Sequence, residues 1–171
     1  MKRERIKIGQ IALTRGTVRV TDPMYDPANT AVTAFQVLTD VKKGNWNCYA
    51  VKVDEGEGER IGELFMQIDG YDEKKDDPYI DYAGKVCVDR GVCGIFDDWE
   101  FKKAYRDDVD REYMFGVVDG ISGCPACSGI VGNGLKAIGV ASRSGYGDGK
   151  YSLYVSYDGE GDIIKVKVVF I

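Results

Sequence analysis

Apolar and polar residues alternate with a period of two along most of the chain. Successive side chains of a strand point to opposite faces of its sheet, so this pattern predicts β-strands. The expected strands cover residues 5–13, 17–21, 33–38, 45–53, 60–68, 79–89, 92–96, 113–118, 135–143, 151–158 and 162–170. Turns rich in glycine, aspartate or proline separate many of them, which favours antiparallel neighbours.

One segment departs from this alternation and predicts the single helix of the chain, near residues 97–107. Asp97 can cap its N-terminus, and Glu100 three residues later completes a capping-box pattern. Trp99, Phe101 and Tyr105 supply apolar surface. A helix this short is stable only when it docks on the rest of the protein, so we expect it to pack against the sheets.

These elements and a length of 171 residues predict one domain, residues 1–171. The composition is 44% hydrophobic and 30% charged, which is ordinary for a globular protein. The predicted class is mainly β (α+β), as an antiparallel β-sandwich or an open barrel with one short helix.

Charge and composition exclude several function classes. The chain has no histidine, which removes the usual general base near neutral pH, the commonest metal ligand and the Ser-His and Cys-His nucleophile pairs. Its formal net charge of −5 argues against nonspecific nucleic-acid binding. No segment approaches the roughly 20 apolar residues that cross a membrane, and no secretory signal is evident. We therefore expect a cytoplasmic protein that does not enter a membrane.

The five cysteines leave three interpretations open. Cys124 and Cys127 have the CxxC spacing that can bind zinc or exchange disulfides. Together with Cys87 and Cys93 they could form a structural zinc site, although the spacing of this second pair is wider than usual. The favoured interpretation is a turn of reduced, mostly buried thiols, because a reducing compartment does not support a disulfide framework. No other cofactor is indicated.

The segment SRSGYGDGKY, residues 142–151, resembles a phosphate-binding loop in its glycine content. Such a loop requires a helix after its glycines, but residues 151–158 alternate as a strand. We therefore predict a strand-to-strand turn whose glycines adopt positive φ. Tyr146 and Asp148 remain candidate ligand-binding side chains, because loops often carry function.

Four aspartates at strand ends or turns could meet in a pocket, namely Asp22, Asp89, Asp97 and Asp148. Without histidine, acid–base chemistry would have to use such carboxylates. Plain turn chemistry also places aspartate at these positions, so both interpretations remain open.

Several stretches together resemble an uncharacterised family of bacterial and phage proteins, domain of unknown function 4241. The similar stretches are GTVRVTDPMYD (16–26), VKKGNWNCY (41–49), VCVDRGVCGIFD (86–97), ASRSGYGDGKY (141–151) and DIIKVKVVF (162–170). Met24 stands where such proteins often have cysteine, and Arg90 where a small residue is usual. The resemblance implies a compact β-rich intracellular domain, often in phage genomes or near toxin systems, and no established activity.

Two functions from different classes follow. The favoured one is a non-enzymatic protein that binds a protein partner, such as an inhibitor or immunity factor from a phage or mobile element. Its expected surface is the acidic segment with Asp97, Asp98, Trp99, Asp107, Asp108 and Asp110. The alternative is a nucleotide-like ligand binder or a histidine-free hydrolase that uses the aspartates above. The oligomeric state cannot be predicted.

Overall fold

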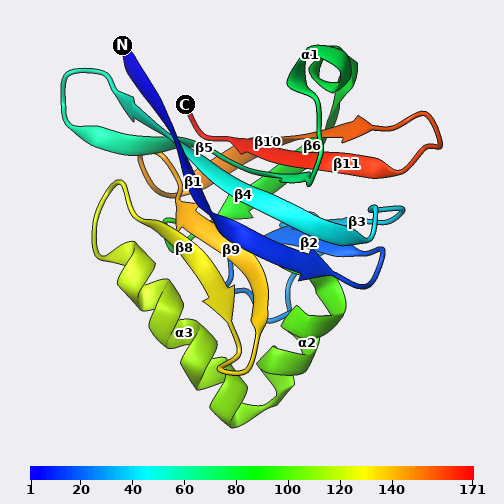
Figure 1. The fold of residues 1–171 in the computed structure, drawn as a ribbon. Helices are drawn as coiled ribbons and strands as arrows, with labels where there is room; N and C mark the ends of the chain where they lie inside the picture. The colour runs from blue at the N-terminus through cyan, green and yellow to red at the C-terminus, as the bar shows by residue number, and fades with distance from the viewer.

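The computed structural model describes residues 1–171 and contains two antiparallel β-sheets with a layer of helices below them (Figure 1). Sheet A has the strand order β1-β4-β5-β11-β10-β6. Its strands are β1 (Lys2–Leu13), β4 (Gly44–Asp54), β5 (Glu59–Ile68), β11 (Ile163–Val169), β10 (Gly149–Tyr157) and β6 (Ile80–Val88). The sheets do not close into a barrel, and the mainly β, α+β class predicted from the sequence, as a sandwich or an open barrel, is confirmed.

Sheet B has the order β3-β2-β7-β9-β8. Its strands are β3 (Gln36–Leu38), β2 (Val18–Thr21), β7 (Val92–Asp97), β9 (Ala137–Arg143) and β8 (Ser128–Gly132). Three helices, α1 (Glu73–Asp76), α2 (Asp98–Arg106) and α3 (Asp108–Ser122), and one 3₁₀ turn, η1 (Asp77–Tyr79), complete the fold. None of the helices has the length and apolar character that a membrane crossing requires.

The larger hydrophobic core lies between the two sheets. In β4, Trp46 and Cys48 point into it, and Leu64 and Met66 of β5 pack beside them. Tyr49, the next residue along β4, faces the other side of sheet A, as the period-two alternation requires. Because one face of each of these strands is buried in this core, apolar and polar residues alternate along them, and this alternation predicted the strands.

A second core fills the space between sheet B and the helices α2 and α3. Phe96 of β7 contacts Phe101 of α2 at 4.7 Å between ring centroids, and Met114 and Val118 of α3 belong to the same cluster. All six residues of β7 are buried, because this strand has apolar neighbours on both faces. Sheet B is therefore the middle layer of a three-layer molecule.

Helix α2 confirms the helix predicted near residues 97–107, but the expectation that it is the single helix was wrong, and α3 is the largest departure. Residues 113–118 were predicted as a strand, but they lie inside this helix. Asp107 caps the helix by accepting hydrogen bonds from the backbone N–H groups of Val109 and Asp110. The buried residues Met114, Val118 and Ile121 recur at helical spacing, so burial against sheet B overrides the local β-propensity of the segment.

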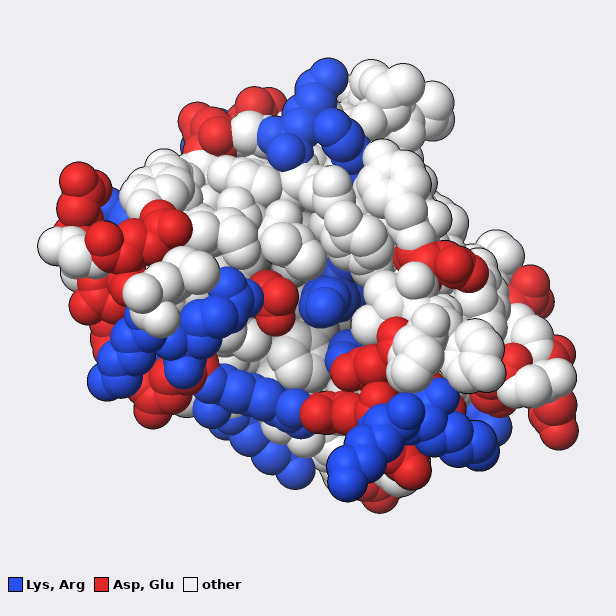
Figure 2. All heavy atoms as spheres, turned by 90° about the horizontal axis from the view of Figure 1, so that it is seen from above, with Lys and Arg blue, Asp and Glu red and all other residues white.

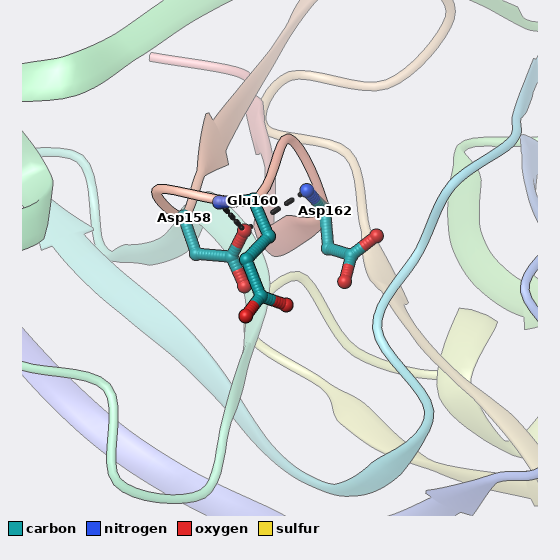
Figure 3. Close-up of side chains that lie close together, drawn as sticks. All are labelled: Asp158, Glu160 and Asp162. Carbon is teal, nitrogen blue, oxygen red and sulfur yellow. Dashed lines mark hydrogen bonds between the residues drawn. The ribbon is translucent and has the colours of Figure 1, made fainter.

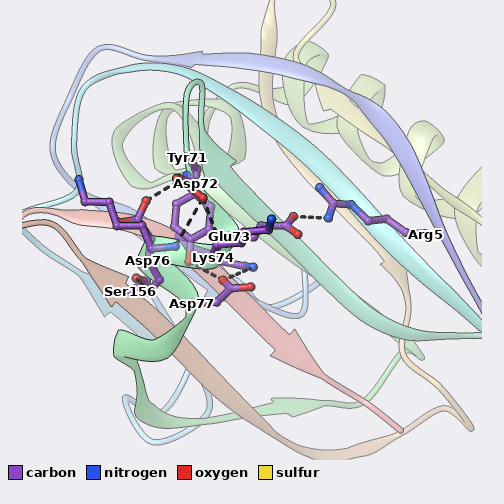
Figure 4. Close-up of polar contacts among 10 residues, drawn as sticks. Arg5, Tyr71, Asp72, Glu73, Lys74, Asp76, Asp77 and Ser156 are labelled. Carbon is purple, nitrogen blue, oxygen red and sulfur yellow. Dashed lines mark hydrogen bonds and ion pairs between the residues drawn. The ribbon is translucent and has the colours of Figure 1, made fainter.

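Two segments that lie between the strands expected from the sequence also contain regular structure. Residues 119–134 include the end of α3 and all of β8, and residues 69–78 form α1 and part of η1. The α1 segment is tied to the outer face of sheet A by several polar contacts, shown in Figure 4. Ser156 donates to the carbonyl of Asp76 at 3.0 Å, and the Lys165 ammonium lies 2.9 Å from the Asp77 carboxylate.

Candidate functional site

Asp22 is a buried anchor of the fold. One carboxylate oxygen accepts the N–H of Met24, and the other accepts the N–H groups of Asp89 and Arg90, each at 2.9 Å. Burial raises the pKa of Asp22, while these three donors act to lower it. The carboxylate joins the loop after β2 to the β6–β7 turn, and its lone pairs are directed at backbone rather than at a ligand.

The four predicted aspartates do not surround one cavity. Asp89 lies beside Asp22 and accepts a hydrogen bond from the Tyr25 hydroxyl at 2.6 Å. Asp97 is at the other end of β7 from the β6–β7 turn, roughly 17 Å along that strand at 3.3 Å per residue. There it caps α2 by accepting the N–H of Glu100 at 2.9 Å, and burial raises its pKa. No cavity of the structure is lined by Asp22, Asp89 or Asp148.

The glycine-rich segment forms a tight turn between β9 and β10. Gly145 and Gly147 have the predicted positive φ, at +55° and +119°, whereas Gly149 does not and begins the strand β10 that the sequence indicated. Ser144 donates its hydroxyl to the Gly147 carbonyl at 2.7 Å, and the Tyr151 hydroxyl donates to the same carbonyl at 2.5 Å. The backbone of the turn is therefore bound by its own side chains.

The two side chains of this turn that the sequence singled out differ in their surroundings. Asp148 is exposed and has neither a hydrogen bond nor an ion pair through its carboxylate. Tyr146 is also exposed, donates to the Glu55 carboxylate and lies under the Arg60 guanidinium, 4.7 Å from the ring centroid. The contacts of these two side chains therefore do not bring several functional groups together at this turn.

The cysteines do not form the zinc site that the sequence allowed. Cys124 and Cys127 are joined in a disulfide, so the prediction of a turn of reduced thiols was wrong for this pair. Cys93 belongs to the core between the sheets, whereas Cys127 packs with the core on the opposite face of sheet B. Cys87 lies on β6 in sheet A. Sheet B therefore lies between cysteines that would have to be adjacent to bind one zinc ion.

A group of three carboxylates lies in the β10–β11 turn, where Figure 3 shows Asp158, Glu160 and Asp162 together. Asp158 accepts the backbone N–H groups of Glu160 and Asp162 and pairs with the Lys42 ammonium at 3.1 Å. Burial acts to raise the pKa of Asp158, but the Asp162 N–H and Lys42 outweigh it and lower the pKa. Asp158 is therefore already paired with a cation and stabilises the turn.

The acidic segment around α2 also differs from the expected partner-binding surface. Asp97 and Asp98 are buried, and Asp98 pairs with buried Arg19 of β2 at 2.7 Å. Asp107 caps α3, and exposed Asp108 pairs with Arg111 at 2.6 Å. Asp110 is half-buried in the first turn of α3. Most of these carboxylates therefore hold the helices in place.

Trp99, the remaining member of that set, is partly exposed and is covered by cations. The Arg15 guanidinium lies 3.9 Å from its ring centroid, and the Lys103 ammonium lies 5.0 Å away. Arg15 also contacts Glu100, a buried carboxylate whose other cation is Lys136. This part of the surface is basic and aromatic instead of acidic.

The outer face of sheet A carries charges of both signs. Figure 2, which looks down on this side of the molecule, shows Lys and Arg side chains beside Asp and Glu around uncharged side chains. Several are paired, including Arg3 with Glu63 at 3.2 Å and Arg5 with Glu73. Acidic and basic side chains therefore adjoin one another on this face.

The clearest unoccupied surface is the edge of sheet A at β6. The strand order ends there, so one side of the β6 backbone has no neighbouring strand. Residues 34–36 cover its far end, because the N–H of Cys87 bonds to the carbonyl of Ala34 and Gln36 bonds to the carbonyl of Lys85. Residues 81–84 have no backbone partner on that side.

Tyrosines gather around this open end of β6. Tyr79, Tyr82 and Tyr157 are 68%, 59% and 42% exposed, and Tyr82 meets half-buried Tyr154 edge to face at 6.0 Å. A cavity of about 480 Å³ lies between Tyr79 and Tyr157. Its charged lining is Asp76, Asp81, Asp158 and Lys75, so carboxylates outnumber cations.

The chain has 11 tyrosines, but their number alone does not indicate this surface. Tyr79 and Tyr82 were assigned to a strand of the expected sheet, and nothing local marks that strand as an edge. The one available signal was the spacing of tyrosines in 79–82 and 151–157, which two neighbouring antiparallel strands bring together. Recognising it required the order of the strands in the sheet.

Comparison with known proteins does not assign a function to these surfaces. No protein family, no curated protein and no solved structure matches this chain.

Proposed function

We propose that this chain is a non-enzymatic binding protein that holds a basic, extended segment of a partner protein along the open edge of β6. The observation that carries the proposal is the coincidence of free backbone groups with three exposed tyrosines at one end of this strand. Through this contact the chain would act as an inhibitor or immunity factor.

The backbone of β6 supports an extended partner. An edge strand presents unpaired N–H and C=O groups that can bind an added strand, and side chains on alternate positions then supply specificity. The opposite edge of sheet A is protected in a different way. β1 carries Lys2, Arg3, Arg5 and Lys7, and such charges discourage pairing with other chains. The β6 edge has no comparable cluster of cations.

The side chains around β6 support a protein partner of basic character. Tyrosine gives large contact area at a small cost in conformational entropy and is enriched in protein interfaces. Asp76, Asp81 and Asp158 line the cavity between Tyr79 and Tyr157, with Lys75 as the one cation. A segment with Lys or Arg side chains would complement this charge.

The alternative of a hydrolase has less support. Asp97 is far from Asp89 along β7 and is committed to capping α2, while Asp22 is saturated by backbone donors. A pair of carboxylates with separated pKa values around a common cavity would favour catalysis, and these residues do not provide one.

A titration with designed peptides tests the proposal. The ¹⁵N-labelled full chain is titrated with an extended peptide that alternates Lys with Val and Thr, and with the same peptide carrying Glu at each Lys position. We expect the basic peptide alone to shift the amide signals of β6 and β10. Tyr82→Ala should weaken its binding about tenfold, the effect of removing an aromatic contact at an interface.

Tyr113→Ala is the matched control, because Tyr113 is an exposed tyrosine on α3, away from sheet A. Its affinity for the basic peptide should equal that of the unchanged protein. Equal binding of the two peptides, or shifts confined to elements other than β6 and β10, would contradict the proposal.

A further inference from the structure

The proposed partner site leaves a second cavity unexplained. It has a volume of about 360 Å³ and lies between α2, the first turn of α3 and residues 26–28 of the loop after β2. Lys102, Tyr105, Arg106 and Arg111 line it together with that loop. We propose that this cavity binds a small molecule through a phosphate group.

The charge of the lining opposes the charge of the chain. Three cationic side chains and one carboxylate, that of Asp26, line the cavity, although the chain as a whole has a formal net charge of −5. Asp26 directs its carboxylate into its own loop. One oxygen accepts the N–H of Ala28 at 2.8 Å, and the other accepts the Asn29 side-chain amide at 3.2 Å. The cavity therefore attracts anions.

The cations at the cavity are incompletely neutralised. Arg106 makes one hydrogen bond, from Nε to the Lys102 carbonyl at 3.2 Å, and no ion pair. Lys102 shares the Asp98 carboxylate with Arg19, so one negative charge serves two positive ones. The carboxylate partner of Arg111 is Asp108, whose side chain is 89% exposed and whose interaction is screened by water.

Arg111 is held at the end of α2 and not by the dipole of its own helix. Basic residues in the last turn of α2, such as Arg106, complement the carbonyl end of that helix. Arg111 is in the first turn of α3, where a cation is unfavourable to the helix dipole. Its guanidinium instead crosses to the carbonyl of Tyr105 at 2.8 Å, at the end of α2. This contact directs the guanidinium toward the same cavity as Arg106.

The walls of the cavity are fixed by contacts already present. The Tyr105 hydroxyl donates to the Met24 carbonyl at 2.8 Å, which joins α2 to the loop after β2. Buried Asp22 holds the N–H of Met24, so the loop is anchored on its other side as well. A cavity whose walls are already fixed loses less conformational entropy when a ligand binds.

The size of the cavity favours a small molecule as the source of the phosphate. A volume of about 360 Å³ lies at the lower end of the range for small-ligand sites. One guanidinium group can donate two parallel hydrogen bonds to the oxygens of a phosphate. Arg106 and Arg111 each supply such a group. A phosphorylated polyol or sugar has the corresponding size and charge.

The experiment is a titration of the full chain with glycerol 3-phosphate, followed by ¹⁵N–¹H spectra. We expect shifts in residues 26–28 and 102–111, weaker binding of inorganic phosphate, and no binding of glycerol. Arg106→Gln and Arg111→Gln should each weaken binding of glycerol 3-phosphate at least about tenfold, in keeping with loss of a charge-assisted contact. Affinity should fall as salt is added.

Lys103→Gln is the matched control, since Lys103 is a cation of α2 that lies over Trp99 and does not line the cavity. Urea unfolding of each variant shows whether the fold is retained, and exposed Arg106 gives the variant least coupled to folding. Equal weakening by Lys103→Gln, binding of glycerol equal to that of glycerol 3-phosphate, or tighter binding of a phosphopeptide than of the small molecule would overturn the proposal.

Discussion

Single carboxylates hold the loops of this protein through backbone N–H groups. The sequence suggested that Asp22 and Asp97 were either ligand-binding residues or turn residues, and both have the second role. The cap of Asp97 on the N–H of Glu100 was predictable because a capping box is local in sequence. The contacts of Asp22 with residues 89 and 90 were not, since they depend on which turns meet in space.

Glu100 shows how a local pattern can be correct in part. It was predicted to complete the capping box, but its carboxylate pairs with Arg15 and Lys136, and one of its oxygens is buried without a hydrogen-bond partner. These two cations come from the turn after β1 and from the turn between β8 and β9. The long-range ion pairs therefore determine where this side chain lies.

Replacing Asp22 should destabilise the fold. In Asp22→Ala three backbone N–H groups lose their acceptor, which should lower the free energy of unfolding by about 2–4 kcal/mol. Asp148→Ala is the control, because this exposed carboxylate has no partner, and its change should stay within about 0.5 kcal/mol. Urea denaturation followed by circular dichroism measures both. A loss for Asp22→Ala as small as that for Asp148→Ala would contradict the assigned role.

Strands were easier to predict than helices in this chain. Alternation in β4, β5, β10 and β11 follows directly from a core on the inner face of sheet A. In 113–118 the β-forming residues suggested a strand, whereas the helical spacing of Met114, Val118 and Ile121 extends beyond that window. A longer window that began at the Asp107 cap would have favoured the helix.

The β9–β10 turn gives a test of how glycine supports an element boundary. Gly147 has φ of +119°, a conformation that other residues rarely adopt, so Gly147→Ala should lower the free energy of unfolding by about 1–3 kcal/mol. Gly116→Ala is the matched control. Gly116 lies within α3 with open space around its Cα, and alanine there should raise the free energy of unfolding by up to about 1 kcal/mol. Thermal unfolding of both variants compares them, and effects of the same sign would count against this explanation.

Of the layered architecture, only the packing of two sheets in a sandwich was predictable from the sequence. Local alternation indicates that two faces are buried, but the order of strands in a sheet is determined by pairings between distant segments. For the same reason neither the open edge at β6 nor the cavity lined by Arg106 and Arg111 could be assembled from sequence. The first is built by β6, β10 and η1, and the second by a loop and two helices.

The disulfide offers a test on the molecule as a whole. Cys124 and Cys127 are three residues apart, so their bond restricts the unfolded chain little. Reduction should lower the free energy of unfolding by at most about 2 kcal/mol and leave α3 docked on sheet B. Urea unfolding with and without dithiothreitol measures the effect, and the double variant Cys124→Ser with Cys127→Ser should not respond to the reductant. Loss of helical circular dichroism on reduction would show a larger role.

The position of β11 between β5 and β10 has a consequence for the synthesis of this protein on the ribosome. β1, β4 and β5 can pair once residues 1–68 are made, because they are adjacent in sheet A and all lie in the first part of the chain. The second neighbour of β5 is β11, which emerges only after β6 to β10. Until then β5 presents an unpaired edge, and Leu64 and Met66 lack their final cover. The nascent three-stranded sheet is therefore the stage at which this chain is most exposed to aggregation or to chaperones.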